Sequence, residues 1–80
     1  MASHKNFMAA TDLKALLGHA IKAHRTSLGI SQEELAQRAG LHRTYVSDLE
    51  RGARNPSIGS IEKIARALQV SAAELLSMKS

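Results

Sequence analysis

Apolar residues in the first third of the chain recur at the spacing of an α-helix. They are Leu13, Leu17, Ile21 and Leu28. Such steps place the side chains on one helix face, whereas a half-buried strand would alternate at every second residue. The pattern predicts a first helix over about residues 12–28, ended by Gly29. Residues 1–11 show no clear period, so we expect an N-terminal arm outside the fold, in which residues 1–6 are either native or an expression remnant.

A second helix is predicted from its start and stop signals. Ser31 stands three residues before Glu34, the capping-box spacing in which a hydroxyl and a carboxylate satisfy the N–H groups of a helix start. This helix should run to about Arg38, because Gly40 then stops it.

A third helix follows Leu41 after a short turn. Val46 and Leu49 are three residues apart, so both can face inward from one side of this helix. Gly52 readily adopts the left-handed conformation that commonly ends a helix, and it is therefore the expected end of the third helix.

The final third of the chain predicts a loop and a fourth helix. Pro56 cannot continue a helix and keeps Asn55 out of the helical conformation, so residues 53–57 form a loop in which Ser57 is the cap of the next helix. The inward stripe of that helix is Ile61, Ile64, Ala65 and Leu68.

A short fifth helix begins at a second capping box. Ser71 and Glu74 have the required spacing, and the helix should carry Leu75, Leu76 and Met78 toward the C-terminus. No segment alternates as a half-buried strand does. The prediction is therefore an all-α domain of five short helices over residues 12–78.

Composition favours a binding module over an enzyme. Eighty residues form one small domain with little room for a catalytic pocket and the scaffold that holds it. Eleven Lys and Arg against seven Asp and Glu give a net charge of +4, which favours polyanionic partners such as nucleic acid. There is no cysteine, and the four histidines lack metal-ligand spacing, so we expect no catalytic residues, metal or cofactor. The apolar runs are too short to span a bilayer, and we expect a cytoplasmic protein without a membrane partner.

The segments around the second and third helices carry a family resemblance. They read SQEELAQRAG over Ser31–Gly40, YVSDLERG over Tyr45–Gly52 and NPS over Asn55–Ser57. In this register the chain resembles the phage-repressor and Cro type of DNA-binding domain. The resemblance implies a five-helix lambda-repressor-like fold with a helix-turn-helix at about residues 32–51. A finer likeness, to the small controller proteins of restriction-modification systems, rests on RTYVS at residues 43–47 followed by LER.

The resemblance implies that the exposed side of the third helix reads bases in the major groove of double-stranded DNA. The expected base contacts are Arg43, Thr44, Tyr45 and Ser47. Arg43 can present two parallel N–H groups to guanine, and hydroxyl groups can bond to bases or phosphates. For Tyr45 two other positions of the ring are open: it could lie against the sugar-phosphate backbone, or it could cover the edge of the core.

Phosphate contacts are expected on both sides of the third helix. The residues that the resemblance implies are Gln32, Arg51, Arg54 and Asn55. Gln32 opens the second helix, where free N–H groups and the helix dipole favour an anion. For Arg51 an alternative is an ion pair with the nearby Asp48 or Glu50.

Arg25 and Glu50 both interrupt surfaces that should face the core. Arg25 shares the stripe of the first helix, and Glu50 lies one turn beyond Val46. A half-buried charge without a partner typically costs on the order of several kcal/mol. We therefore expect the two residues to form a structural ion pair. Members of the family show the same pairing.

One short helix reads too few base pairs to select an operator, so the resemblance also implies a homodimer on a palindromic site. We expect Leu75, Leu76 and Met78 to form the dimer interface, because a short helix has more apolar surface here than one inward face can hide. The alternative is that Leu75 and Leu76 both turn inward. The expected function is a sequence-specific transcriptional regulator, with RNA polymerase as a further candidate partner.

A different class of function remains open from the residues alone. The same fold could serve as a protein-interaction adaptor, such as an antitoxin that neutralises a toxin. The two hypotheses differ in the salt dependence of duplex binding, because an adaptor without phosphate contacts would show neither affinity nor slope. The sequence does not indicate the operator, the regulated gene, or whether the protein activates or represses.

Overall fold

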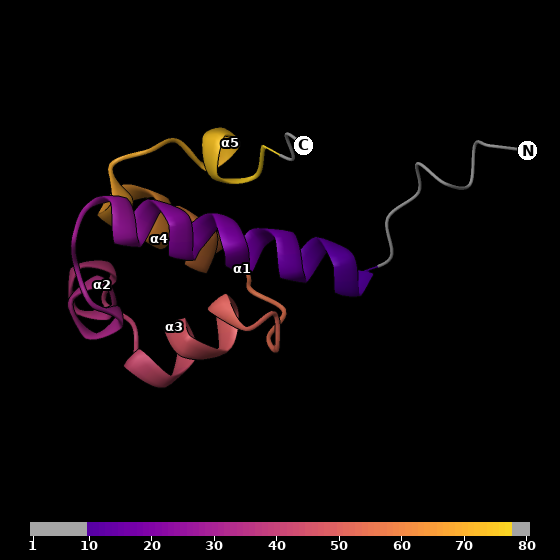
Figure 1. The fold of residues 1–80 in the computed structure, drawn as a ribbon, viewed down its shortest axis with the longest axis horizontal. Coiled ribbons are helices and arrows are strands. Elements are labelled where there is room, and N and C mark those ends of the chain that lie inside the picture. Colours follow the sequence, from indigo (N-terminus) through magenta and orange to yellow (C-terminus); the bar gives the residue numbers. More distant parts are fainter. Residues whose placement is uncertain (1–9, 78–80) are drawn as a thin grey trace, which may run out of the picture.

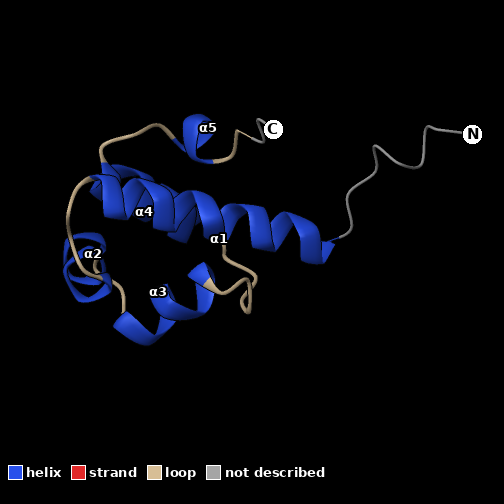
Figure 2. Ribbon diagram, viewed as in Figure 1, coloured by secondary structure: helices blue, strands red, loops and turns tan. Residues whose placement is uncertain are grey.

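A computed structural model describes residues 10–77 of the chain, which form five helices and no strand (Figure 2). The helices are α1 (Ala10–Ser27), α2 (Gln32–Ala39), α3 (Arg43–Glu50), α4 (Ile58–Leu68) and α5 (Ala72–Leu75). The all-α prediction and the order of the five helices are confirmed. None of these helices is both long enough and apolar enough to span a membrane.

The long α1 helix forms the centre of the fold, with α2 and α3 on one side of it and α5 on the other (Figure 1). The core lies between α1 and the helices around it. Its fully buried large side chains are Ile21, Leu35, Val46, Leu49, Ile64 and Leu75. One small core therefore holds α3 in place, and the other side of α3 remains available.

The apolar stripe predicted for α1 is only partly buried. Leu17 and Ile21 lie in the core, but Leu13 is 48% exposed and Leu28 is 41% exposed. The first turns of α1 extend past the neighbouring helices (Figure 1), which leaves Leu13 at the edge of the core. Leu28 follows the last helical residue, and the buried Ile30 fills the core after the turn.

The start of α2 forms half of the predicted capping box. The Ser31 hydroxyl accepts a hydrogen bond from the Glu34 N–H at 3.0 Å. The Glu34 carboxylate instead accepts a hydrogen bond from Arg38 at 2.8 Å, one helical turn later. Gly40 ends α2 in the left-handed conformation with φ 71°, as predicted for the turn before α3.

A glycine that the sequence pattern did not single out sets the distance between α1 and α3. A Cβ atom at Gly18 would lie 2.5 Å from the Leu49 carbonyl oxygen and 2.6 Å from the Glu50 carbonyl oxygen. Both contacts are with backbone, so no side chain can move aside. Gly18 therefore lets the backbone of α1 approach the last turn of α3.

The C-terminal helices begin at the predicted caps. Ser57 accepts a hydrogen bond from the Ser60 N–H at 3.1 Å, and both hydrogen bonds of the Ser71–Glu74 capping box are present. The α5 helix is shorter than expected and ends at Leu75 after about one turn. Met78 lies outside the described residues.

Candidate nucleic-acid interface

The α3 helix has a buried side and an accessible side. Val46 is 0% exposed and Leu49 is 2% exposed, so these two residues anchor the helix to the core. Arg43 and Thr44 in the first turn are exposed, and Ser47 is half-buried. Arg43 forms no ion pair within the described residues, so its guanidinium group is available to an external acceptor.

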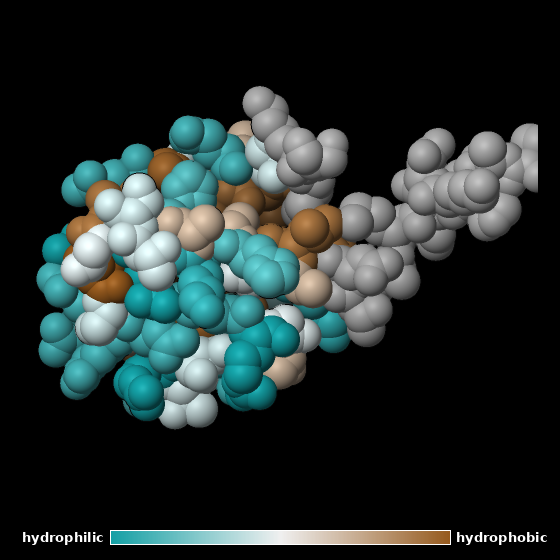
Figure 3. Space-filling view, viewed as in Figure 1, coloured by the Kyte–Doolittle hydropathy of each residue, from teal (hydrophilic) through white to brown (hydrophobic). Residues whose placement is uncertain are grey.

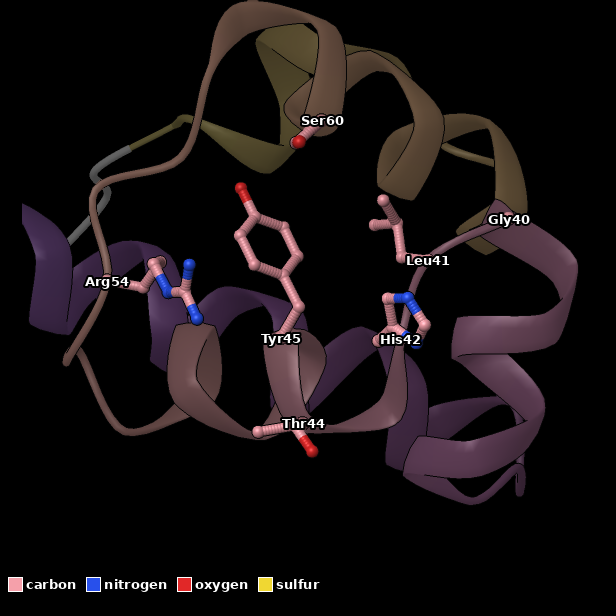
Figure 4. Close-up of a pocket in the computed structure, with 7 residues that line it drawn as sticks. All are labelled: Gly40, Leu41, His42, Thr44, Tyr45, Arg54 and Ser60. Atoms are coloured by element: carbon pink, nitrogen blue, oxygen red, sulfur yellow. The ribbon is translucent and has the colours of Figure 1, made fainter.

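Beside this helix lies an open cleft of about 530 Å³ between the α2–α3 turn, α3 and the first turn of α4. Its lining residues are Gly40, Leu41, His42, Thr44, Tyr45, Arg54 and Ser60. Figure 4 shows the Tyr45 ring extending toward Ser60, with Arg54 beside it and Thr44 pointing the other way. Tyr45 is half-buried and packs against the core, so it has both a structural contact and an accessible edge.

The carboxylate of Asp48 holds two of the arginines predicted to contact phosphate. Asp48 Oδ2 accepts a hydrogen bond from Arg54 Nη2 at 3.2 Å, and Oδ1 accepts one from Arg51. The hydrogen bond from Arg54 is the largest cause of a lowered Asp48 pKa; burial opposes it and Arg51 adds to it. Of the two partners considered for Arg51, the structure has Asp48. Both arginine side chains remain accessible, at 64% exposed for Arg51 and 47% for Arg54.

The predicted pair of Arg25 and Glu50 is confirmed. Arg25 Nε lies 2.6 Å from Glu50 Oε2, and Nη2 lies 3.0 Å from Oε1. Arg25 Nη1 also donates a hydrogen bond to the Ile30 carbonyl at 2.9 Å. The hydrogen bond with Glu50 raises the Arg25 pKa, although burial acts in the opposite direction.

Gln32 joins this pair instead of extending freely from α2. Its Nε2 donates a hydrogen bond to Glu50 Oε1 at 2.9 Å, a contact that the sequence pattern did not indicate. The side-chain amide keeps a second N–H, and the backbone N–H groups of the first turn of α2 have no partner within the helix. The phosphate contact of Gln32 therefore stays a prediction, now with a defined side-chain orientation.

Asn55 borders a second groove of about 210 Å³ and takes no part in the hydrogen bonds of Asp48. The other lining residues of this groove are Leu13, Lys14, Leu17, Pro56, Ile61 and Leu76. Figure 3 shows hydrophobic surface over the first half of α1 and between α1 and α5. The phosphate contact of Asn55, which is exposed and follows Arg54 directly, stays a prediction.

The end of the chain corrects one part of the predicted dimer interface. Leu75 is 0% exposed and belongs to the core of the single chain, so it offers no surface to a second one. Leu76 is 39% exposed and lines the apolar groove, and Met78 lies outside the described residues. Neighbouring residues of a helix point about 100° apart, so the core covers Leu75 and leaves Leu76 exposed.

A scan against protein families matches the helix-turn-helix family over residues 21–75. The chain belongs to the helix-turn-helix family. The match includes α2, α3 and the loop that carries Arg54, and it agrees with the resemblance to the phage-repressor type. Helix-turn-helix proteins of this type are DNA-binding transcriptional regulators. This chain belongs to the same class.

Relatives of this helix-turn-helix chain are named as regulators. A hypothetical transcription factor from Neisseria meningitidis is 49% identical over 65 residues, which cover 81% of this chain and 61% of the relative. The control protein C.BamHI from Bacillus amyloliquefaciens is 47% identical over 66 residues, which cover 81% of this chain and 82% of the relative. The crystal structure of the restriction-modification controller protein C.AhdI from Aeromonas hydrophila has a TM-score of 0.76 at 44% identity, covering 78% of this chain and 94% of that protein.

Proposed function

We propose that the chain is a sequence-specific transcriptional regulator that binds double-stranded DNA as a homodimer, with α3 in the major groove. The observation that carries this proposal is the two-sided character of α3. Its apolar residues Val46 and Leu49 are buried, while Arg43, at its first position, is exposed and has no ion-pair partner within residues 13–77. The N-terminal turn of a recognition helix is the part that meets base edges in this class of domain.

The base contacts would come from the accessible side of α3. Arg43 can donate two parallel hydrogen bonds to guanine O6 and N7, and Thr44 can offer a hydroxyl and a methyl group. Ser47, one turn after Arg43, is half-buried and can reach a base or a phosphate. Tyr45 would contact the DNA from the cleft beside α3.

Phosphate contacts would flank the recognition helix. Arg51 and Arg54 follow α3, and their guanidinium groups remain accessible while Asp48 orients them. The first turn of α2, which begins at Gln32, offers N–H groups to a second phosphate. Asn55, the exposed residue after Arg54, would add a further phosphate contact from the same loop.

The dimer would form through the apolar groove beside α5. Leu13 and Leu76 are the exposed apolar residues that line it, at 48% and 39% exposed. A two-fold axis through this surface would place two α3 helices on one side of the duplex, about 34 Å or one helical turn apart. Arg43 is not among the residues that line this groove, so it would remain free to read each half-site.

Selection from a pool of random duplexes, followed by binding measurements at several salt concentrations, tests this function. We expect a palindromic consensus and an affinity that falls steeply with salt, because each neutralised phosphate releases counterions. A protein-interaction adaptor would select no consensus and would show no salt-dependent affinity for duplex DNA. That result would refute the proposed function.

A further inference from the structure

A carboxylate, a guanidinium group and an aromatic ring are connected beside α3. Asp48 Oδ2 accepts a hydrogen bond from Arg54 Nη2 at 3.2 Å, and the central carbon of the Arg54 guanidinium lies 4.9 Å from the centre of the Tyr45 ring. Asp48 and Tyr45 belong to α3, whereas Arg54 belongs to the following loop. Figure 4 shows Arg54 lying next to the ring at the edge of the cleft.

The three groups suit one another chemically. The face of an aromatic ring attracts a cation, and a planar guanidinium can lie over a ring while its N–H groups bond to a carboxylate. Tyr45 is half-buried against the core on one side, so the contact with Arg54 limits the remaining directions that its ring can take. Asp48 is therefore connected to Tyr45 through Arg54, and it makes no direct contact with the ring in any interaction described for residues 13–77.

Asp48 also places a negative charge among the proposed phosphate contacts. The Asp48 side chain is 19% exposed and its carboxylate binds both Arg51 and Arg54, so one negative charge offsets part of two positive charges. Phosphates in any duplex would be attracted by these arginines regardless of base sequence. A carboxylate at this position would lower that general attraction while it accepts a hydrogen bond from each of the two guanidinium groups.

We propose that Asp48 is a specificity-determining residue that positions Tyr45 through Arg54 and limits sequence-independent binding to phosphates. This inference rests on the proposed function, because it requires that α3 reads DNA. It differs from that function in assigning part of the discrimination to an acidic residue that contacts no base.

The first test compares Asp48→Asn with Glu62→Gln, a matched loss of one negative charge. Glu62 is exposed on α4 and takes part in no ion pair within the described residues. For each variant, the dissociation constants for the selected operator and for an unrelated duplex are measured at one salt concentration. Discrimination is the dissociation constant for the unrelated duplex divided by that for the operator. We expect this ratio to fall about fivefold or more in Asp48→Asn, which is the lower end of what one base contact contributes. Glu62→Gln should leave the ratio unchanged, and an equal ratio in both variants would overturn the proposal.

The second test observes Tyr45 in the free protein. Tyr45 is the single tyrosine and there is no tryptophan, so its ring signals are identified directly in a carbon–proton NMR spectrum. We expect these signals to move in Asp48→Asn and in Arg54→Lys, and to stay in place in Glu62→Gln. Ring signals at the wild-type position in Asp48→Asn and Arg54→Lys would show that Asp48 does not position Tyr45.

Arg54→Lys also covers the case in which Asp48→Asn fails to fold. Lysine keeps the positive charge but has no planar group to lie over the ring. The slope of affinity against salt should therefore stay near the wild-type value while discrimination between operator and unrelated duplex falls. Unchanged discrimination would count against the proposal.

If the wild-type protein binds no duplex, the proposed function fails, and the NMR comparison still decides whether Asp48 and Arg54 position Tyr45.

Discussion

Glu50 of α3 forms a two-bond ion pair with Arg25 of α1, with nitrogen–oxygen distances of 2.6 and 3.0 Å. The two side chains are 12% and 3% exposed, so the pair is nearly inaccessible to water. Gln32 of α2 donates a third hydrogen bond to the same carboxylate at 2.9 Å. Glu50 thus connects three helices, and the two helices of the helix-turn-helix are joined to α1 at one point.

Removing the Glu50 carboxylate should destabilise the domain strongly. Glu50→Ala leaves the Arg25 guanidinium buried without its partner, and we expect a loss on the order of 3–5 kcal/mol in the free energy of unfolding. The double variant Arg25→Met with Glu50→Leu should recover much of this loss, because it removes both charges and keeps apolar volume. Urea titrations of the three proteins measure these differences. An unchanged midpoint for Glu50→Ala would show that the pair contributes little.

Arg43→Ala should reduce discrimination among DNA sequences with little change in folding. One bidentate contact to guanine contributes about 1–3 kcal/mol, and the exposed Arg43 has no partner within the described residues whose loss would destabilise the domain. Selection from the random duplex pool should then yield a consensus that has lost its preference at one position in each half-site. Retention of the wild-type consensus would assign base reading to other residues.

Arg51→Ala should weaken binding to all sequences together. Loss of one phosphate contact lowers the slope of log affinity against log salt concentration by roughly one. Arg66→Ala is the matched control, because Arg66 is an exposed arginine on α4 away from the cleft. The proposed contact requires a clear difference in slope between these two variants, and equal slopes would contradict it.

Gly18→Ala should destabilise the domain, whereas Gly59→Ala should not. The Cβ at residue 18 would lie within 2.6 Å of two backbone carbonyl oxygens of α3, and such overpacking typically costs about 1–3 kcal/mol or more. The Cβ at residue 59 meets only the Ser57 hydroxyl at 3.9 Å, and alanine favours a helix over glycine by about 0.5–1 kcal/mol. Thermal unfolding of both variants should therefore show shifts of opposite sign. A stable Gly18→Ala variant would mean that α1 and α3 can separate at little cost.

Leu76→Glu should prevent dimer formation at micromolar concentrations. A charge placed in the apolar groove would have to be desolvated at the proposed interface. Leu28→Glu is a suitable control, since Leu28 is exposed to a similar extent, 41% against 39%, and lies outside the groove. Sedimentation equilibrium distinguishes the two. A wild-type protein that remains monomeric, or a Leu76→Glu variant that still dimerises, would refute this interface.

Much of the fold could be predicted because its signals act over a few residues. Ser57 and Ser71 cap the helices that follow them, since a hydroxyl needs only the N–H three residues away. Val46 and Leu49 were expected to face inward because the helical period fixes their common side, and both are buried. The pair of Arg25 and Glu50 could also be predicted, because two charges on core-facing surfaces need each other.

Tertiary packing decided the contacts between residues that are distant in sequence. The helical period put Leu13 and Leu17 on one stripe, but only packing against the other helices determines that Leu17 is buried and Leu13 is not. The place of Gly18 against α3 depends on where two helices cross, which no local pattern encodes. Asp48 binds Arg51 three residues away, and it also binds Arg54 because the loop after α3 turns back beside it. The sequence by itself therefore determined the helices, their caps and their inward sides, whereas the crossing of those helices decided which side chains meet on the proposed DNA-binding surface.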